Sequence, residues 1–394
     1  MVFLASVGII FIMKIVMLTS CLGRGGAERV ASILCNAWAE RGDEVSLIAT
    51  FSGGGKAFYD ISPSVETIFL ADVVGSRQKN IGSYFHRLLT LRKLIAARKP
   101  DVVVSFLPNV NVAAIAATAM LGIPVVVCER SDPSARSPRD FWEMCCKATY
   151  RFADMLIVQT ENVASKVTGI YPGLRAVRCI PNPLPPTILP LRKSGGTRKI
   201  LLSLGRLSPE KQVDQIIDAF AEVAGQASDW DLHIYGDGPE KPALAARIRR
   251  LGLQDRAFLK GATKESAKVM AGADAFMMAS KYEGFPNALL EAMAAGLPCI
   301  AADCESGPRE MTRNGKDALL VPVGNRAAMI EALSSLVDNA PLRMSLGGYA
   351  RQSVLARYSL HSVLSAWDEV FAAVGAIPAF GGNLQSASKV LRER

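Results

Sequence analysis

Residues 14–40 read KIVMLTSCLGRGGAERVASILCNAWAE, and they set the class of fold. The opening run KIVMLTS is apolar and β-branched, which is typical of a buried parallel strand, and residues 27–40 have the apolar spacing of an amphipathic helix. Between the two lies a turn that contains Gly23, Gly25 and Gly26. A strand, a glycine turn and a helix in this order predict the first unit of an open parallel sheet.

The same alternation recurs along the rest of the chain in two series. Strands are expected in the first series at 14–20, 44–50, 101–107, 124–129 and 155–160, and in the second at 199–205, 231–236, 257–260, 274–279, 298–302 and 317–322. Helices are expected at 27–40, 81–98, 109–121, 211–226, 239–251, 286–295 and 326–338. This pattern predicts two α/β domains, each a doubly wound parallel sheet, that face each other across a ligand-binding cleft.

A segment rich in Pro, Gly and basic residues separates the two series. Residues 181–199 read PNPLPPTILPLRKSGGTRK, without a helical period, and are interpreted as an interdomain linker. The tail at 375–394 is polar and Gly-rich and is expected to be mobile. The apolar run 2–13 is too short for a membrane-spanning helix of about 20 residues. Residues 1–12 are therefore interpreted as an upstream extension, with a short membrane-dipping anchor as the alternative.

The composition of the 394 residues is half apolar and 21% charged, which excludes a disordered polymer. Eight Cys without any C-x-x-C exclude a disulfide scaffold and disfavour a zinc or iron–sulfur site. The His residues at 86, 233 and 361 are too dispersed to form a metal cluster from sequence neighbours. A net charge of +9, larger in the first half of the chain, indicates an anionic partner: nucleic acid, phosphate or an acidic membrane surface.

Glycine and basic residues follow the strands where the cleft is expected. The glycine turn leaves bare N–H groups at a helix N-terminus, which attract phosphate, although steric necessity alone also explains such glycines. The turn lacks the G-x-G-x-x-G spacing, so a nicotinamide-dependent reductase is excluded. In GRLSPEKQ, residues 205–212, Arg206 and Lys211 are suited to neutralise a diphosphate leaving group, but a solvated turn has the same pattern.

A second candidate site lies in KYEGFPNALLEAMAAGLP, residues 281–298. Glu283 is expected in a loop and Glu291 on the helix after it, where both carboxylates are suited to accept hydrogen bonds from sugar hydroxyls. Glu residues on a helix are often only solvated, but these two flank a Gly-Phe-Pro start beside an apolar helix, which favours a binding role. The free N–H groups of this helix start, which suit a phosphate, belong to Asn287, Ala288 and Leu289.

Four motifs occur together in the order and spacing of a known family. They are Gly-Gly-Ala-Glu (25–28), Gly-Arg-Leu…Glu-Lys (205–211), Tyr-Gly-x-Gly-Pro (235–239) and Glu-x7-Glu (283–291). With them, residues 13–374 resemble the retaining glycosyltransferases of family 4, which have the two-domain GT-B fold. The resemblance implies an acceptor-binding domain at 1–185, a nucleotide-sugar-binding domain at 186–359, and a helix at 360–374 that crosses back to the first domain.

The resemblance also implies a donor site. Its residues are Gly25, Gly26, Arg206, Lys211, Ala262, Glu283, Phe285, Pro286, Asn287, Ala288, Leu289 and Glu291. The glycines, Arg206 and Lys211 would bind the diphosphate of a nucleotide-sugar, Glu291 the ribose and Glu283 the transferred sugar, with backbone near Ala262 beside the nucleobase. Arg206, Lys211 and Glu283 are the expected catalytic residues. No metal or other cofactor is expected, since cations and helix N-termini neutralise the leaving group, and the Asp-x-Asp at 229–231 is interpreted as a turn.

The acceptor side departs from the family in one respect. Many relatives have a His on the loop after the strand equivalent to 101–107, whereas this chain has Asn109 as the expected substitute. Glu129 and Arg130, which end another strand, are expected acceptor contacts. These loops resemble a branch that acts on lipid-linked bacterial glycans, often with UDP-hexoses or UDP-N-acetylhexosamines.

A basic stretch at 76–100 carries seven Lys/Arg, no acid, and apolar residues at helical spacing. Besides packing on the domain, such a helix is suited to an anionic membrane surface or a lipid diphosphate, whereas no motif indicates nucleic acid. The expected protein is therefore a cytoplasmic transferase at the inner face of the cell membrane. It would form an α-glycosidic bond to a polyprenyl-diphosphate-linked or other lipid-linked acceptor. The alternatives are a nucleotide-sugar epimerase of the same fold and a two-lobed solute-binding protein, which would require export.

Overall fold

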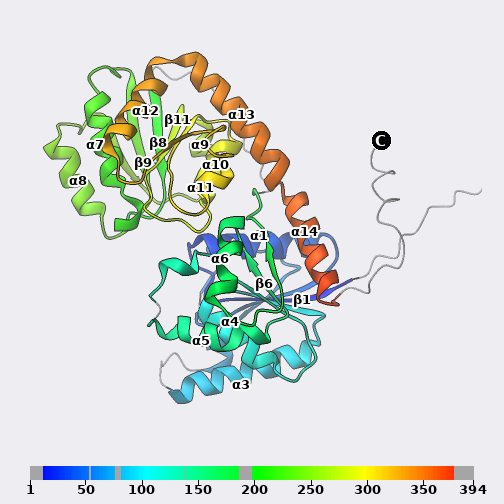
Figure 1. The fold of residues 1–394 in the computed structure, drawn as a ribbon. Coiled ribbons are helices and arrows are strands. Elements are labelled where there is room, and N and C mark those ends of the chain that lie inside the picture. Colours follow the sequence, from blue (N-terminus) through cyan, green and yellow to red (C-terminus); the bar gives the residue numbers. More distant parts are fainter. Residues whose placement is uncertain (1–11, 53–54, 76–80, 138, 186–197, 377–394) are drawn as a thin grey trace, which may run out of the picture.

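The computed structural model describes residues 12–52, 55–75, 81–137, 139–185 and 198–376. These residues form two α/β domains, each built around a parallel sheet, which confirms the expected fold class (Figure 1). Residues 1–11, 76–80, 186–197 and 377–394 lie outside the described residues. The interpretations of the upstream extension, the linker, the start of the basic stretch and the tail therefore rest on the sequence alone.

The sheet of the first domain has seven parallel strands in the order β3-β2-β1-β4-β5-β6-β7. The strands are β1 (Lys14–Thr19), β2 (Glu44–Ala49), β3 (Glu66–Phe69), β4 (Val102–Phe106), β5 (Val125–Cys128), β6 (Met155–Val158) and β7 (Val177–Cys179). The central strands are apolar at nearly every position because helices cover both of their faces. In β4, for example, all five residues of VVVSF are buried.

Helices cover both faces of this first sheet. They are α1 (Gly26–Glu40), α2 (Leu70–Val74), α3 (Ile81–Arg98), α4 (Pro108–Thr118), α5 (Phe141–Thr149) and α6 (Glu161–Ile170). On one face, α1 contributes Leu34 and Trp38 to the core. On the other face, α3, α4 and α6 contribute Ile95, Ala114 and Val167.

The second domain repeats this plan with six strands in the order β10-β9-β8-β11-β12-β13. The strands are β8 (Lys199–Leu204), β9 (Trp230–Tyr235), β10 (Ala257–Gly261), β11 (Ala275–Met278), β12 (Cys299–Ala302) and β13 (Leu319–Val321). Its helices are α7 (Val213–Val223), α8 (Lys241–Arg250), α9 (Ser266–Ala271), α10 (Asn287–Ala294), α11 (Pro308–Met311), α12 (Arg326–Asp338) and α13 (Ala340–Tyr358). One face of the sheet packs on α7, α8 and α12, and the other on α9, α10 and α13.

The strand orders fix where a ligand can bind. In each sheet the order reverses next to the first strand, between β1 and β4 in one domain and between β8 and β11 in the other. At such a reversal the helices on either side leave toward opposite faces, so a crevice opens at the carboxyl ends of the strands. The glycine turn at 20–25 follows β1, and the basic loop at 205–212 follows β8. Both sequence motifs therefore lie at these crevices.

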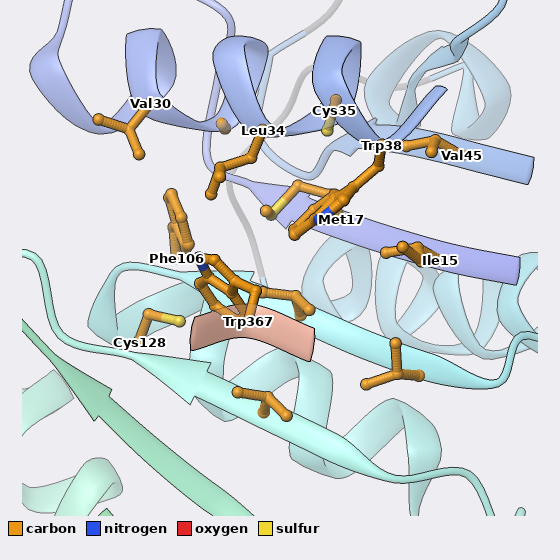
Figure 2. Close-up of a cluster of buried hydrophobic side chains, with 14 of the residues drawn as sticks. Ile15, Met17, Val30, Leu34, Cys35, Trp38, Val45, Phe106, Cys128 and Trp367 are labelled. Carbon is orange, nitrogen blue, oxygen red and sulfur yellow. The ribbon is translucent and has the colours of Figure 1, made fainter. Parts of the chain in front are cut away.

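The last helix of the chain returns to the first domain. Helix α14 (Leu360–Ala373) follows α13 directly, and its residues Trp367 and Phe371 join the core beside α1. Their rings lie 5.7 and 5.6 Å from that of Trp38, centroid to centroid. Figure 2 shows Trp38 and Trp367 within this buried cluster. The chain thus passes between the two domains twice, once in the linker region and once between α13 and α14. These two connections are hydrogen-bonded to each other, since Leu184 N–H donates to Tyr358 O (2.8 Å).

The sequence pattern did not predict several elements. The strands β3 and β7 lie at the two edges of the first sheet, where short, half-exposed runs lack a continuous apolar pattern. Helices α5 and α6 were also missed, as was the 19-residue α13. The expected strand at 155–160 ends at Val158, because Thr160 instead caps α6 by accepting a hydrogen bond from Val163 N–H.

Candidate active site

A cleft between the two domains runs along the carboxyl ends of both sheets. It contains two adjoining hollows, of about 530 and about 1080 Å³, whose walls come from both domains. The residues common to both hollows include Gly25, Gly26, Arg29, Arg130 and Arg206. The shared wall therefore combines bare backbone with guanidinium groups, which is the composition of an anion-binding surface.

Two helix N-termini meet in the cleft. Gly25 is the N-cap of α1, and a Cβ placed on Gly26 would lie 3.0 Å from Nδ2 of Asn287, the first residue of α10. A Cβ at Gly25 would lie 2.0 Å from Oε2 of Glu28, so the Glu28 side chain, whose other oxygen accepts from Cys21 Sγ (3.2 Å), would have to move. Each helix end carries partial positive charge, so the pair favours an anion between the domains.

The basic loop and the first of the two expected carboxylates come together on the second-domain wall. Lys211 Nζ lies 2.7 Å from Glu283 Oε1, and Ser280 Oγ donates to the same oxygen at 2.7 Å. Arg206 is exposed on this wall, and the described residues provide it with no ion-pair or hydrogen-bond partner. Of the two cations in the loop after β8, Lys211 is paired with Glu283 and Arg206 is open to a ligand.

The second expected carboxylate, Glu291, is contacted from both domains. Its side chain is almost fully buried, and Oε1 lies 2.5 Å from Nη1 of Arg29 on α1. Its Oε2 accepts from Ser266 Oγ at 2.8 Å, and Arg29 Nη2 also reaches that hydroxyl, at 3.3 Å. The carboxylate is therefore fixed in orientation by three hydrogen bonds among these residues.

The start of α10 differs in part from the expectation. Pro286 is the N-cap, and Asn287 N–H already donates to Phe285 O at 3.0 Å, so this N–H is not free for a phosphate. Ala288, in contrast, lines the cleft. Leu289 is fully buried in the core, so its side chain is structural. Phe285 and Pro286 line the cleft, and Phe285 also packs on the ring of Tyr358.

Ala262 lies on the wall of the larger hollow, beside the loop that follows β9. That loop approaches the basic loop very closely, because a Cβ on Gly236 would stand 1.8 Å from Gly205 O. Gly236 also has φ +153°, which side chains rarely allow. Across the hollow lie Phe58 and Tyr59 of the first domain, so this part of the cleft has one backbone wall and one aromatic wall.

The two neighbouring residues expected to contact the acceptor have different surroundings. Arg130 lines the cleft, stacks 4.2 Å from the ring centroid of Phe106, and donates to Asn182. Burial lowers the pKa of Arg130 to about 10. Glu129 is instead buried in the first domain, where it accepts from Tyr150 (2.5 Å) and pairs with Arg136 (2.8 Å). Its burial raises its pKa.

The expectation that Glu129 contacts an acceptor in the cleft is therefore wrong for this structure. Asn109, also expected on the acceptor side of the cleft, does not line it. It lies in the first turn of α4, half-buried, and is not among the residues that line either hollow. Its neighbour Asn111 is fully buried and donates to Cys128 O and Tyr150 Oη. Arg130 is thus the one expected acceptor residue that reaches the cleft.

Sequence reasoning missed several residues that line the cleft. Arg29 lies one residue after the Gly-Gly-Ala-Glu motif and points across the cleft to Glu291. Asn182, at the end of the first domain, donates to Asn287 Oδ1 at 2.7 Å and so links Arg130 to α10. Phe58 and Tyr59 come from a loop without periodicity. The position of Arg29 beside a glycine turn was an available signal, but its partner is distant in sequence.

Clusters that could ligate a metal and helices that could span a membrane are both absent from the described part of the chain. Within the described ranges no group of three His, Cys, Asp or Glu residues is arranged to hold a metal ion. The Asp229 and Asp231 carboxylates lie at the amino end of β9, where they pair with Lys199 (2.6 Å) and Arg198 (2.7 Å), away from the cleft. No helix in the described part of the chain is long and apolar enough to cross a membrane.

Comparison with known proteins agrees with this architecture. The family model "Glycosyltransferase Family 4" matches residues 24–187, and "Glycosyl transferases group 1" matches residues 191–353. A Campylobacter jejuni GalNAc-α-(1→4)-GalNAc-α-(1→3)-diNAcBac-PP-undecaprenol α-1,4-N-acetyl-D-galactosaminyltransferase is 27% identical over 86% of this chain and 93% of that protein. A Streptomyces coelicolor exopolysaccharide phosphotransferase is 35% identical over 55% of this chain, but the match spans only 23% of that longer protein.

A solved structure extends the likeness to the whole fold. Anabaena HepE, in complex with UDP and glucose, superposes with a TM-score of 0.75 at 18% identity, covering 92% of this chain and 100% of that one. The two family models match the two domains in the order in which the structure places them. The chain is a member of glycosyltransferase family 4, with the GT-B fold.

Proposed function

We propose that the protein transfers a hexose or N-acetylhexosamine from a nucleotide-sugar, specifically a UDP-sugar, to a lipid-linked or polysaccharide acceptor. The transfer would retain the anomeric configuration and form an α-glycosidic bond. The observation that carries this proposal is the convergence of two helix N-termini, Arg206, Lys211 and two carboxylates in one interdomain cleft. UDP is favoured because HepE was solved with UDP and glucose.

In this proposal the donor spans the cleft floor. Its diphosphate lies between the N-termini of α1 and α10, where Arg206 is open to an anion. Lys211 exchanges its contact with Glu283 for the diphosphate, which frees that carboxylate to accept from the hydroxyls of the transferred sugar. Glu291 accepts from the ribose hydroxyls, and the nucleobase lies along the wall that contains Ala262.

The chemical step then needs charge neutralisation more than a protein base. As the glycosidic bond breaks, negative charge grows on the leaving diphosphate, and Arg206, Lys211 and the helix ends stabilise it without a metal ion. The departing phosphate takes the proton of the attacking acceptor hydroxyl on the same face of the sugar, which retains the configuration. The enzyme's main contribution is to hold the two reactants in this orientation.

The acceptor would approach from the first domain past Arg130. The Campylobacter relative is named for a PP-undecaprenol-linked acceptor, which supports a polyprenyl-diphosphate-linked or similar glycan here. Helix α3 exposes Tyr84, Phe85 and Leu89 beside the exposed Lys93. An apolar and basic helix surface of this kind suits an anionic bilayer, so we place the protein peripherally on the cytoplasmic face of the cell membrane.

The transfer proposal is tested by product analysis in EDTA. Purified protein is incubated with UDP-glucose, UDP-N-acetylglucosamine or GDP-mannose and a membrane glycolipid extract, and the anomeric proton coupling of the product is read by NMR. An α-linked product from a UDP-sugar in EDTA supports the proposed donor, the retention of configuration and the metal-free leaving-group role of Arg206 and Lys211. A β-linked product would refute retention, and a requirement for added metal would refute the neutralising role of Arg206 and Lys211.

Membrane binding is tested separately with vesicles. Phosphatidylglycerol-containing vesicles should co-sediment the wild-type protein, while the double change Phe85→Ser and Leu89→Ser should release it. Met344→Ser is the matched control, because Met344 is 78% exposed but lies on α13 of the other domain. Equal sedimentation of all three proteins would contradict the assignment of α3 to the bilayer.

A further inference from the structure

The contact between Arg29 and Glu291 is an ion pair across the domain boundary. Arg29 lies on the first turn of α1 in the first domain, and Glu291 lies on α10 in the second. The guanidinium reaches Glu291 through Nη1 and Ser266 through Nη2, while Ser266 donates to the other oxygen of Glu291. The three side chains thus form a closed triangle with one corner in each of α1, α9 and α10.

The burial of this pair gives it more weight than an ordinary surface salt bridge. The Glu291 side chain is 3% exposed and that of Arg29 is 23% exposed. Within the described residues Arg29 is the one cation in an ion pair with Glu291. Removal of one partner from such a pair leaves a buried charge without compensation, which is strongly unfavourable. The orientation of Glu291 therefore depends on a residue of the opposite domain.

The triangle leaves acceptor positions unused on this carboxylate, which lines the cleft. An ionised carboxylate has about four acceptor positions, and Arg29 and Ser266 take one on each oxygen. Two positions remain for the paired hydroxyls of a ribose. A carboxylate held at a fixed angle binds such a pair without first losing rotational freedom, which is the general advantage of preorganisation.

We propose that Arg29 is a positioning residue for nucleotide recognition. It holds Glu291 in the orientation that accepts the ribose hydroxyls, and it does so only while the two domains are closed. The neighbouring contacts share this dependence on closure, since Gly26 and Asn287 meet across the boundary and Asn182 donates to Asn287. The proposal rests on the assignment of the ribose to Glu291, and it adds that the first domain completes this subsite.

The test compares two ligands that differ only in the ribose. The affinities of UDP and of 2′,3′-dideoxy-UDP are measured by calorimetry for wild-type protein, Arg29→Met, Arg29→Lys and Arg24→Ala. Methionine keeps the length of the side chain without its charge, and lysine keeps the charge without the fork that spans Glu291 and Ser266. Arg24 is the matched control, because it also lines the cleft but contacts Phe58 rather than Glu291.

Wild-type protein should bind UDP at least tenfold more tightly than the dideoxy compound, since hydrogen bonds to a charged group are worth about 10- to 100-fold in affinity. Arg29→Met should bind both compounds within about twofold, Arg29→Lys should lie between, and Arg24→Ala should keep the wild-type ratio. Circular dichroism melting confirms that each variant is folded. Because the readout is a ratio of two affinities, a general loss of stability does not mimic the expected result.

The possible failures are distinct. If wild-type protein does not discriminate between the two ligands, the ribose assignment of Glu291 is wrong, and this inference falls with it. If wild-type protein discriminates and folded Arg29→Met does so equally, the ribose assignment stands and the positioning role of Arg29 is refuted.

Discussion

Gly284→Ala should keep both domains folded but prevent them from closing. Gly284 lies between Glu283 and Phe285, and a Cβ placed on it would stand 2.6 Å from Ser131 Cα and 2.7 Å from Arg130 O of the opposite domain. Carbon atoms in ordinary contact lie about 3.5–4.0 Å apart, so the domains must separate locally by about 1 Å. The obstructing atoms are backbone, which cannot rotate out of the way as the end of a flexible side chain can.

The size of the expected effect follows from this displacement. A misplacement of about 1 Å between reacting groups costs about 100-fold in rate, so kcat should fall by about this factor. The clash lies between domains rather than inside one, and the domains can relieve it by opening. The melting temperature should therefore change by less than about 2 °C, which corresponds to less than about 1 kcal/mol for a domain of roughly 150–250 residues.

The assay combines steady-state transfer kinetics with small-angle X-ray scattering. Gly284→Ala should show lower kcat and a larger radius of gyration with UDP bound than the wild-type protein. Gly225→Ala is the matched control, because no atom lies within 4 Å of a Cβ at that position. Wild-type kcat in Gly284→Ala would refute the claim that this close approach is needed for catalysis, and an equal loss in Gly225→Ala would show that the effect is not specific to the cleft.

Three further predictions concern single side chains. Lys211→Met should lower kcat about 10²–10³-fold, as for loss of one charge-stabilising group, while Lys268→Met, 77% exposed on α9, should leave it unchanged in the same transfer assay. Trp367→Ala should destabilise the first domain by about 3–5 kcal/mol in urea unfolding, and a loss under 1 kcal/mol would contradict the role of α14 in its core. Burial alone would raise the pKa of Asp317, but the Arg313 guanidinium holds it below its ordinary value. Its contribution to stability is then present above about pH 4 and lost as the pH falls through the lowered pKa, so the difference in urea midpoint between wild-type protein and Asp317→Asn should shrink toward pH 3.

The fold was predictable where burial on both faces imposes continuous apolar runs. The interior strands β4 and β5 are of this kind, and every residue of each is buried. The edge strand β3, with two exposed and two half-buried residues, has no such signature. Its pairing with β2 is fixed by the neighbouring strand rather than by its own pattern.

The residues of the site could be predicted from the sequence where their position follows from the sheet geometry. The rule that ligands bind at the carboxyl ends of strands brought Arg206, Lys211 and Glu283 together correctly in one cleft. It could not distinguish Glu129 from Arg130, because successive residues after a strand face opposite ways and only the packed structure determines which faces the cleft. Nor could it identify Arg29 as the partner of Glu291, since 262 positions separate the two in the chain.

The contribution of α14 to the first core has a consequence for synthesis of the chain. The first domain packs around Trp38, but the rings of Trp367 and Phe371 that complete this core leave the ribosome only after the whole second domain. At about 5–20 residues per second, the second domain takes roughly 10–40 s to translate. During this interval Trp38 packs against its own sheet but lacks the two rings that α14 adds to the core. A nascent chain stalled before residue 360 would have an incomplete first core, which makes it a substrate for chaperones and proteases.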